Sequence, residues 1–346
     1  MLLQNLSSQR LLRIESNMSD LRFDPINGQW VAMASDRVQR PNEFQQIMQR
    51  KELSRCPFCA GNEEDTPPPI LQVPQDPRDK KWIVRVFPNK YPSFSDDNGD
   101  KPANPSATFG PYPSHGAAGH QEVIVNSPRH VESMSELTRE ELFVSFQVYR
   151  ERVHVLQENQ VLEHVMLFKN CRAEAGASLQ HIHTQIIGTP NISDDLRLRW
   201  ERMRNHRDAT GVSLLTSILE WEKKSEERML DVTPNYTTFC PFASRFGYQV
   251  WIVPNQEIAD FGRINDQQSD ELAELCQKYV ERFDQCLDMP AYNLLLHLAP
   301  REFRGYQHWF VELFPRLTRA AGFEWGTGYW INPFPPEKAA ADLRKI

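Results

Sequence analysis

The chain has 346 residues, of which 40% are apolar and 25% are charged, as is normal for a soluble globular enzyme. Its formal net charge of -7 argues against a duplex-binding protein, which usually presents a basic face, but allows a small anionic ligand held by a few arginines. No apolar run approaches the roughly 20 residues that a membrane span needs, so we expect neither nucleic acid nor a membrane as a partner.

Residues 1–20 are expected to form a loosely ordered N-terminal extension. They contain scattered leucines and arginines but no continuous apolar stretch, which argues against a signal peptide. The six cysteines of so long a chain are better explained as reduced thiols of a cytoplasmic protein than as a disulfide framework. The close spacing of Cys56 and Cys59 then indicates metal binding or redox chemistry.

Next along the chain, Arg37 and Arg40 lie beside a predicted turn in residues 29–44. Two guanidinium groups at this spacing either belong to a solvated charged loop or grip a diphosphate, because a guanidinium matches the geometry of phosphate oxygens. The residues alone leave both interpretations open.

The C-x-x-C pattern of Cys56 and Cys59 places two thiols where both can reach one cation. A redox pair or a purely structural pair remains an alternative, although a redox motif usually begins a helix and this one stands in a proline-rich loop. His130 and His181 are the candidates for two further ligands. Two thiolates and two neutral imidazoles would make a closed tetrahedral site of the kind that holds structural zinc.

The order of predicted elements in residues 120–185 recurs in residues 247–312. Each stretch has a short strand, a long helix with an apolar stripe and a second strand, and ends in a segment that contains a histidine. The first helix opens at a capping box formed by Thr138 and Glu141. Residues 190–235, between the copies, are polar, rich in arginine and helical in pattern. We therefore predict an α+β protein of two related halves, each an antiparallel sheet with one long helix.

The two copies are unequal, because only the first keeps potentially reactive groups. We interpret residues 21–195 as the half that carries the chemistry and residues 196–346 as a degenerate half. The aligned positions are His183 with Phe310, Gln185 with Glu312, and Cys59 of Cys56-Pro57-Phe58-Cys59 with Ala243 of Cys240-Pro241-Phe242-Ala243.

His181, His183 and Gln185 alternate in a strand-like segment, so their side chains share one face. The plain interpretation is an edge strand with surface histidines. The small-residue loop that precedes them favours another, because small residues let backbone N–H groups approach a phosphate. A histidine nitrogen is a competent nucleophile toward phosphorus, and Gln185 can donate a hydrogen bond to the phosphoryl oxygens as charge builds there.

These motifs together resemble those of the galactose-1-phosphate uridylyltransferase family, a branch of the histidine-triad superfamily built from a duplicated half. The resemblance runs from about Arg22 to Arg344. It implies two histidine-triad-like halves, a bound zinc ion and a homodimer. The matching runs are RFDPINGQWV, DRVQRP, CPFCAGNE, FPNKYP, SPRH, KN followed by GAS and HxHxQ, and FEWGTGYWINPFPPE.

The resemblance also implies roles for individual residues. His183 would be the nucleophile of a ping-pong cycle, in which it takes UMP from UDP-glucose and passes it to galactose 1-phosphate, with Gln185 assisting at the phosphoryl group. The implied zinc ligands are Cys56, Cys59, His130 and His181. The implied substrate contacts are Arg37, Arg40, Asn89, Asn170, Ser178, Gln185 and the run Gly326, Thr327 and Gly328.

The chain departs from the best-known members of that family at three places. Ile182 stands where they have proline between the paired histidines. Gly326-Thr327-Gly328 replaces a Tyr-Glu pair that reads the hexose hydroxyls, and Phe310 and Glu312 replace a His-x-His metal site, so we expect no second metal.

The ending GTGYWINP resembles two groups of relatives at once, the bacterial and archaeal transferases with a Gly-Thr/Ser-Gly run and the plant-type ADP-glucose phosphorylases. The phosphorylases use the same histidine but let inorganic phosphate discharge it. Phosphorolysis of ADP-glucose is therefore a second predicted function. A zinc-stabilised protein that binds nucleotides without turnover is a third.

Overall fold

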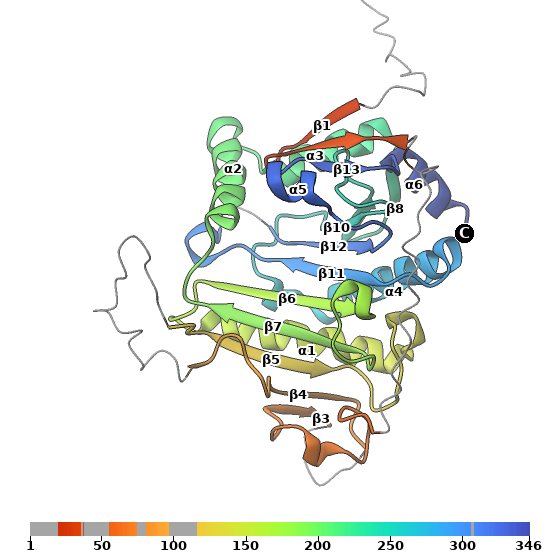
Figure 1. Cartoon of the computed structure of the whole chain (residues 1–346). Helices are drawn as coiled ribbons and strands as arrows, with labels where there is room; N and C mark the ends of the chain where they lie inside the picture. The colour runs from red at the N-terminus through yellow and green to blue at the C-terminus, as the bar shows by residue number, and fades with distance from the viewer. Residues whose placement is uncertain (1–19, 36, 38–54, 75–80, 97–115, 306–307) are drawn as a thin grey trace, which may run out of the picture.

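The computed structural model describes residues 20–35, 37, 55–74, 81–96, 116–305 and 308–346 (Figure 1). Its strands are β1 (Asp20–Asp24), β2 (Gln29–Met33), β3 (Leu71–Val73), β4 (Val84–Pro88), β5 (His120–Val125), β6 (His164–Cys171), β7 (His183–Thr189), β8 (Met229–Val232), β9 (Tyr236–Phe239), β10 (Val250–Pro254), β11 (Tyr292–His297), β12 (Phe310–Pro315) and β13 (Trp330–Asn332). Its α-helices are α1 (Arg139–Glu158), α2 (Asp194–Thr210), α3 (Leu214–Ser225), α4 (Asp266–Leu287), α5 (Gly322–Thr327) and α6 (Pro336–Arg344). The predicted α+β class is confirmed.

The large sheet has the strand order β3-β4-β5-β7-β6-β11-β12-β10-β9-β8. The first half supplies β5-β7-β6 and the second supplies β11-β12-β10. Across the sheet, the equivalent strands of the second half therefore come in the reverse order of those of the first. They meet where β6 and β11 pair antiparallel, from Tyr292 opposite Cys171 to Leu296 opposite Leu167. The prediction gave each half its own sheet; the structure joins them, because pairing two edge strands satisfies N–H and C=O groups that would otherwise stay open.

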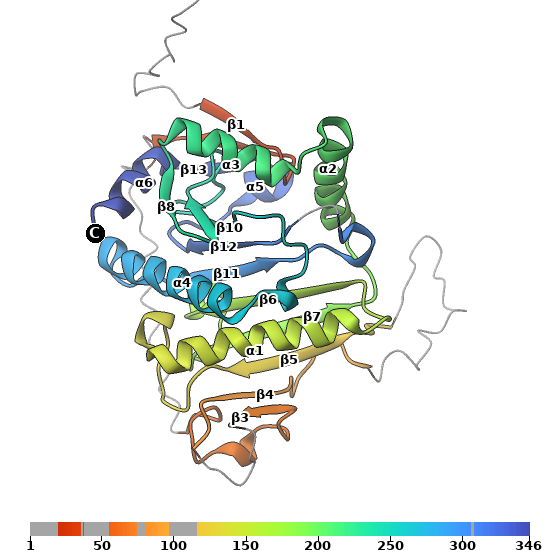
Figure 2. The same ribbon diagram turned by 180° about the vertical axis from the view of Figure 1, so that it is seen from behind.

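The long helices α1 and α4 cover the same face of the large sheet (Figure 2). Helix α1 begins at the predicted capping box, in which the side chains of Thr138 and Glu141 each accept the other's backbone N–H. Neither of these two helices covers the opposite face of β5, β7 and β6. The predicted apolar stripes are buried except at Leu287, the last residue of the second stripe, which is partly buried. The buried members are Leu142, Phe146, Tyr149, Val153 and Leu156 of α1 and Leu272, Leu275, Tyr279 and Phe283 of α4.

A smaller sheet of β1, β2 and β13 lies beside the second half. Arg22 of β1 donates to Glu337 of α6 at 2.8 Å and to the carbonyl of Phe242 at 3.1 Å. The predicted limit between residues 195 and 196 falls inside α2, and residues 20–33 contact elements beyond it. The domain limits therefore stay a prediction. In the described parts of the chain, no helix combines the length and hydropathy needed to cross a membrane.

Candidate active site

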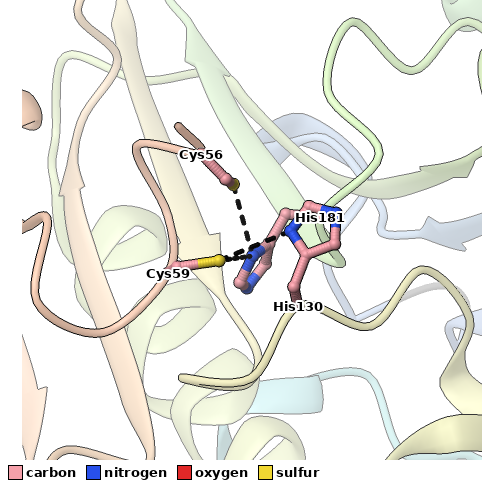
Figure 3. Close-up of side chains that lie close together, drawn as sticks. All are labelled: Cys56, Cys59, His130 and His181. Atoms are coloured by element: carbon pink, nitrogen blue, oxygen red, sulfur yellow. Dashed lines mark hydrogen bonds between the residues drawn. The ribbon is translucent and has the colours of Figure 1, made fainter. Parts of the chain in front are cut away.

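Cys56, Cys59, His130 and His181 converge on one point (Figure 3), and their ligand atoms all lie within 4.8 Å of one another. Sγ of Cys59 is 3.4 Å from Nδ1 of His130 and 3.6 Å from Nδ1 of His181. Sγ of Cys56 is 3.5 Å from the same nitrogen of His181. In a tetrahedral zinc site with Zn–S of about 2.3 Å and Zn–N of about 2.05 Å, sulfur and nitrogen stand about 3.6 Å apart. The four residues are thus spaced to hold a zinc ion.

The imidazole of His181 is oriented to present Nδ1 to the two thiols. Its Nε2–H donates to the backbone carbonyl of Ser127 at 2.8 Å, which leaves Nδ1 free to bind a metal. Burial lowers the pKa of His181 to about 4, so the ring is in the neutral form that a ligand needs. Burial and the neighbouring Cys56 raise the pKa of Cys59 to about 11, so a bound cation would be needed to hold this sulfur as a thiolate.

His183 begins β7 two residues after His181, and its side chain is 6% exposed. Its Nδ1–H donates to the backbone carbonyl of His181 at 2.8 Å, which makes Nε2 the unprotonated nitrogen of the neutral ring. Burial lowers the pKa of His183 to about 4, so the imidazole is neutral at physiological pH. The carbonyl that orients the ring belongs to a candidate zinc ligand, so the metal cluster and the candidate nucleophile are directly coupled.

Residues 172–180, the free-donor loop, precede His183 and present free backbone N–H groups. Arg172 and Gly176 have φ of 69° and 95°, and Gly176 fits because it carries no Cβ. Within the described residues, the N–H groups of Ser178, Leu179 and Gln180 donate to no group of the chain. Successive unpaired N–H groups in a tight loop make an anion-binding concavity. The predicted contact Ser178 is exposed on this loop.

Gln185 and Asn170 lie on the open face of the large sheet. Gln185 is opposite Phe168 on β6 and Val123 on β5, and two residues beyond Phe168 the alternation places Asn170 on the same face. The amide of Asn89 follows β4, where its Oδ1 accepts the N–H of Tyr91 at 2.9 Å. The structure therefore brings Gln185 and Asn170 to the face that carries His183, with Asn89 at the end of a strand in the same half.

On its other side, β7 contacts a buried polar network that was not predicted from the sequence. Nζ of Lys169 donates to the backbone carbonyl of His183 at 2.9 Å and to Oδ1 of Asn126 at 2.7 Å. Asn126 in turn donates to the hydroxyl of Tyr149 on α1, which shares a 2.7 Å hydrogen bond with Thr184. Burial lowers the pKa of Lys169 to about 7. A lysine inside the apolar run HVMLFKN was the available signal, since a buried polar side chain needs partners.

Other predicted contacts lie apart from His183 within the chain. Arg37 is exposed just after β2, and Arg40 lies outside the described residues. Gly326, Thr327 and Gly328 are exposed at the end of α5, which leads into β13. β2 and β13 belong to the small sheet and β7 to the large one. Across the described ranges, no hydrogen bond or ion pair links these residues to the segment that carries His183.

In the second half, a buried charge cluster lies beside the position equivalent to the nucleophile. Phe310, which aligns with His183, stacks on His297 at 4.4 Å between ring centroids. His297 shares hydrogen bonds with Glu312 at 2.7 Å and with Arg199 at 2.9 Å, and Arg245 lies 3.2 Å from Glu312. Burial opposes ionisation of Glu312, but Arg245 and His297 outweigh it and lower its pKa to about 2. The cluster connects α2 to β11 and β12 and thereby stabilises the packing of the second half.

The variant Glu312→Gln is expected to lower the free energy of unfolding by about 3 kcal/mol at neutral pH, because it leaves Arg199 and Arg245 without a buried countercharge. The pKa of Glu312 is depressed from 4.5 to about 2, so its contribution is complete above about pH 4.5 and is lost as the pH falls toward 2. Chemical denaturation of wild type and variant across pH should show their difference shrink in acid. The exposed Glu220→Gln is the matched control, and a gap that stays constant with pH would contradict the assignment.

The comparisons with known proteins find relatives that match nearly the whole chain. ADP-glucose phosphorylase of Arabidopsis thaliana is 28% identical over 340 residues, which cover 96% of this chain and 94% of that protein. Galactose-1-phosphate uridylyltransferase of Thermotoga maritima is 25% identical over 338 residues, covering 95% of this chain and 98% of that one. The crystal structure of an Arabidopsis thaliana ADP-glucose phosphorylase with bound ADP-glucose superposes with a TM-score of 0.82 at 27% identity, over 95% and 99% of the two chains.

The family described as "Galactose-1-phosphate uridyl transferase, N-terminal domain" matches residues 11–192. This segment contains the candidate zinc cluster, the free-donor loop and His183. By name, the two whole-length relatives are a phosphorylase and a uridylyltransferase, and the sequence motifs resemble the same group of enzymes. The chain is therefore a member of the galactose-1-phosphate uridylyltransferase family.

Proposed function

We propose that the protein moves a nucleotidyl group from a nucleotide sugar to a phosphate-bearing acceptor through a covalent intermediate on His183. Nε2 of His183 attacks the α-phosphorus, the N–P bond forms, and the P–O bond to the sugar 1-phosphate breaks. The acceptor's phosphate oxygen then displaces His183 in the second half of a ping-pong cycle. The observation that carries this proposal is the buried, neutral imidazole with a free Nε2, fixed by its Nδ1 hydrogen bond and preceded by the loop of free N–H groups.

The remaining first-half residues take supporting roles. The N–H groups of residues 178–180 and the amides of Asn170 and Gln185 would bind the phosphoryl oxygens and stabilise the charge that builds on them. Asn89 would contact the nucleotide. A zinc ion held by the four-residue cluster would supply rigidity rather than Lewis-acid chemistry, because four protein ligands leave no open position.

A homodimer accounts for the predicted contacts that lie apart from His183. Arg37 follows β2, and the run Gly326 to Gly328 ends α5 just before β13. All of them are exposed, and in the described parts of the chain no hydrogen bond or ion pair joins them to the segment that carries His183. Family members are usually dimers in which residues cross between subunits. The partner's Arg37 would then meet the diphosphate, and the partner's Gly326, Thr327 and Gly328 would border the sugar.

Two reactions fit this site. UMP transfer from UDP-glucose to galactose 1-phosphate was predicted first from the sequence. The 28% identity to the phosphorylase, against 25% to the uridylyltransferase, favours testing AMP transfer from ADP-glucose to inorganic phosphate beside it. The two reactions share the first half-cycle and differ in the base and in the acceptor.

A panel assay separates them. UDP-glucose and ADP-glucose are each mixed with galactose 1-phosphate or inorganic phosphate, and release of glucose 1-phosphate is followed. Turnover of UDP-glucose only with the sugar phosphate identifies the uridylyltransferase reaction, and turnover of ADP-glucose with phosphate identifies the phosphorylase. A protein that binds both nucleotides and never acquires a nucleotidyl group would instead be the non-catalytic binding protein.

A further inference from the structure

Gln121, a buried amide outside the predicted site, controls the orientation of Gln185. Its Nε2 donates to Oε1 of Gln185 at 3.2 Å, and its Oε1 accepts the backbone N–H of Ser93 at 2.9 Å. A backbone N–H can only donate, so Ser93 fixes which end of the Gln121 amide is which. The backbone carbonyl of Gln121 also accepts the N–H of Asn89 at 2.9 Å, which attaches the segment after β4 to the same residue.

The consequence for Gln185 follows from the two ends of its amide. Its Oε1 is taken by Gln121, so its NH2 end faces the open side of the sheet, and among the described residues Nε2 has no partner. Gln185 thus presents two N–H donors, and no acceptor, on the face that carries His183.

Asn293 does the same for Asn170, and it comes from the degenerate half. Its Nδ2 donates to Oδ1 of Asn170 at 2.8 Å and to the backbone carbonyl of Ala175 at 2.9 Å. A backbone carbonyl can only accept, so Ala175 fixes the orientation of Asn293, and the NH2 end of Asn170 points away from β11. A Cβ at Gly176 would stand 3.6 Å from Nδ2 of Asn170, which places that amide against the free-donor loop.

We infer that Gln121 and Asn293 are positioning residues that hold the NH2 ends of Gln185 and Asn170 toward the phosphoryl oxygens of the bound nucleotide. The inference rests on the proposed function. Donors fixed before the reaction need not reorganise as negative charge grows, which is why such groups lower the barrier. A freely turning amide would spend part of its time with its carbonyl oxygen against the phosphate oxygens.

The variant Gln121→Glu tests this by reversing the polarity. A carboxylate still accepts the N–H of Ser93 but cannot donate to Gln185, so Gln185 should turn, donate to the introduced carboxylate and present its own carbonyl to the phosphate. The first half-reaction, followed as the rate at which the protein gains one nucleotidyl group, is expected to slow about 100-fold, comparable to losing one oxyanion donor. Gln121→Met frees Gln185 to rotate and also removes the acceptor of the Ser93 N–H, but it turns no acceptor toward the phosphate, so it should slow the reaction about tenfold or less.

A double-mutant cycle separates positioning from added charge or altered structure. Gln121→Glu is made in wild type and again in the Gln185→Met background, and the rate ratio is compared. The ratio should be about tenfold larger in wild type, because the second background has no amide to turn. Equal ratios in the two backgrounds would overturn the inference, since charge repulsion or disruption of the fold acts whether or not Gln185 is present.

Asn293→Asp and Asn293→Leu form the corresponding pair, compared in wild type and in the Asn170→Ala background. The Asp variant should again be the slower, and its effect should shrink when Asn170 is gone. Wild-type protein is the reference for both cycles. If it gains no nucleotidyl group from either UDP-glucose or ADP-glucose, the proposed function fails; if it does and the ratios are equal, only the positioning role fails.

Discussion

Replacing His183 with glutamine is expected to abolish nucleotidyl transfer, with a loss on the order of 10⁴-fold or more in the first half-reaction. The reason is that Nε2 of His183 is the free nitrogen at this site: its Nδ1 is occupied by the carbonyl of His181, and His181 itself faces the two thiols. Glutamine keeps a hydrogen-bonding side chain of similar length but offers no nucleophile. Mass measurement of the intact protein after mixing with nucleotide sugar should show one added nucleotidyl group on wild type and none on the variant.

The control for this experiment is His206→Gln. His206 lies on α2, where its Nε2 is 3.0 Å from the hydroxyl of Ser217 and outside the site. This variant should gain the nucleotidyl group at the wild-type rate. If the His183→Gln protein still acquires the group, the covalent step occurs on another residue and the proposed mechanism is wrong.

Removing the zinc ligand set should cost both stability and activity. Cys59→Ser, or prolonged treatment of wild type with a chelator, is expected to remove about one zinc per chain. The free energy of unfolding should then lie about 4 kcal/mol below that of wild type measured with free zinc at a thousandfold excess over its Kd. The first half-reaction should slow with it, because His181, once free of the metal, no longer holds in place the carbonyl that orients His183.

Metal content and thermal unfolding measure this directly, with Cys286→Ser as the matched control. Cys286 is a partly buried thiol on α4 and is not among the clustered ligands. Adding zinc back should restore stability to chelated wild type but not to Cys59→Ser. Wild-type protein that is purified without bound metal and whose unfolding does not respond to added zinc would contradict the zinc assignment.

The sequence by itself determined the parts of this protein that depend on local periodicity. The stripe from Leu142 to Leu156 has the helical repeat, and its residues are buried as expected. The alternation of His181, His183 and Gln185 indicated a strand, and β7 begins within it, because side chains in a strand repeat every second residue. The likeness between the halves predicted the repeated elements, and the motifs in combination identified the family and the four residues that cluster around one point.

Only the tertiary structure decided which of these faces and edges meet. Periodicity shows which side of a strand is buried but not which strand lies next to it, so the joining of both halves into one sheet through β6 and β11 was not predicted. That joining brings Asn293 to Asn170, 123 residues earlier in the chain. Gln121 and Gln185, 64 residues apart, meet because β5 and β7 are neighbours in the sheet. The orientation of the amides of Gln121 and Asn293 depends on backbone groups of Ser93 and Ala175, which are close in space but distant in the sequence. Such contacts leave no repeat in the sequence.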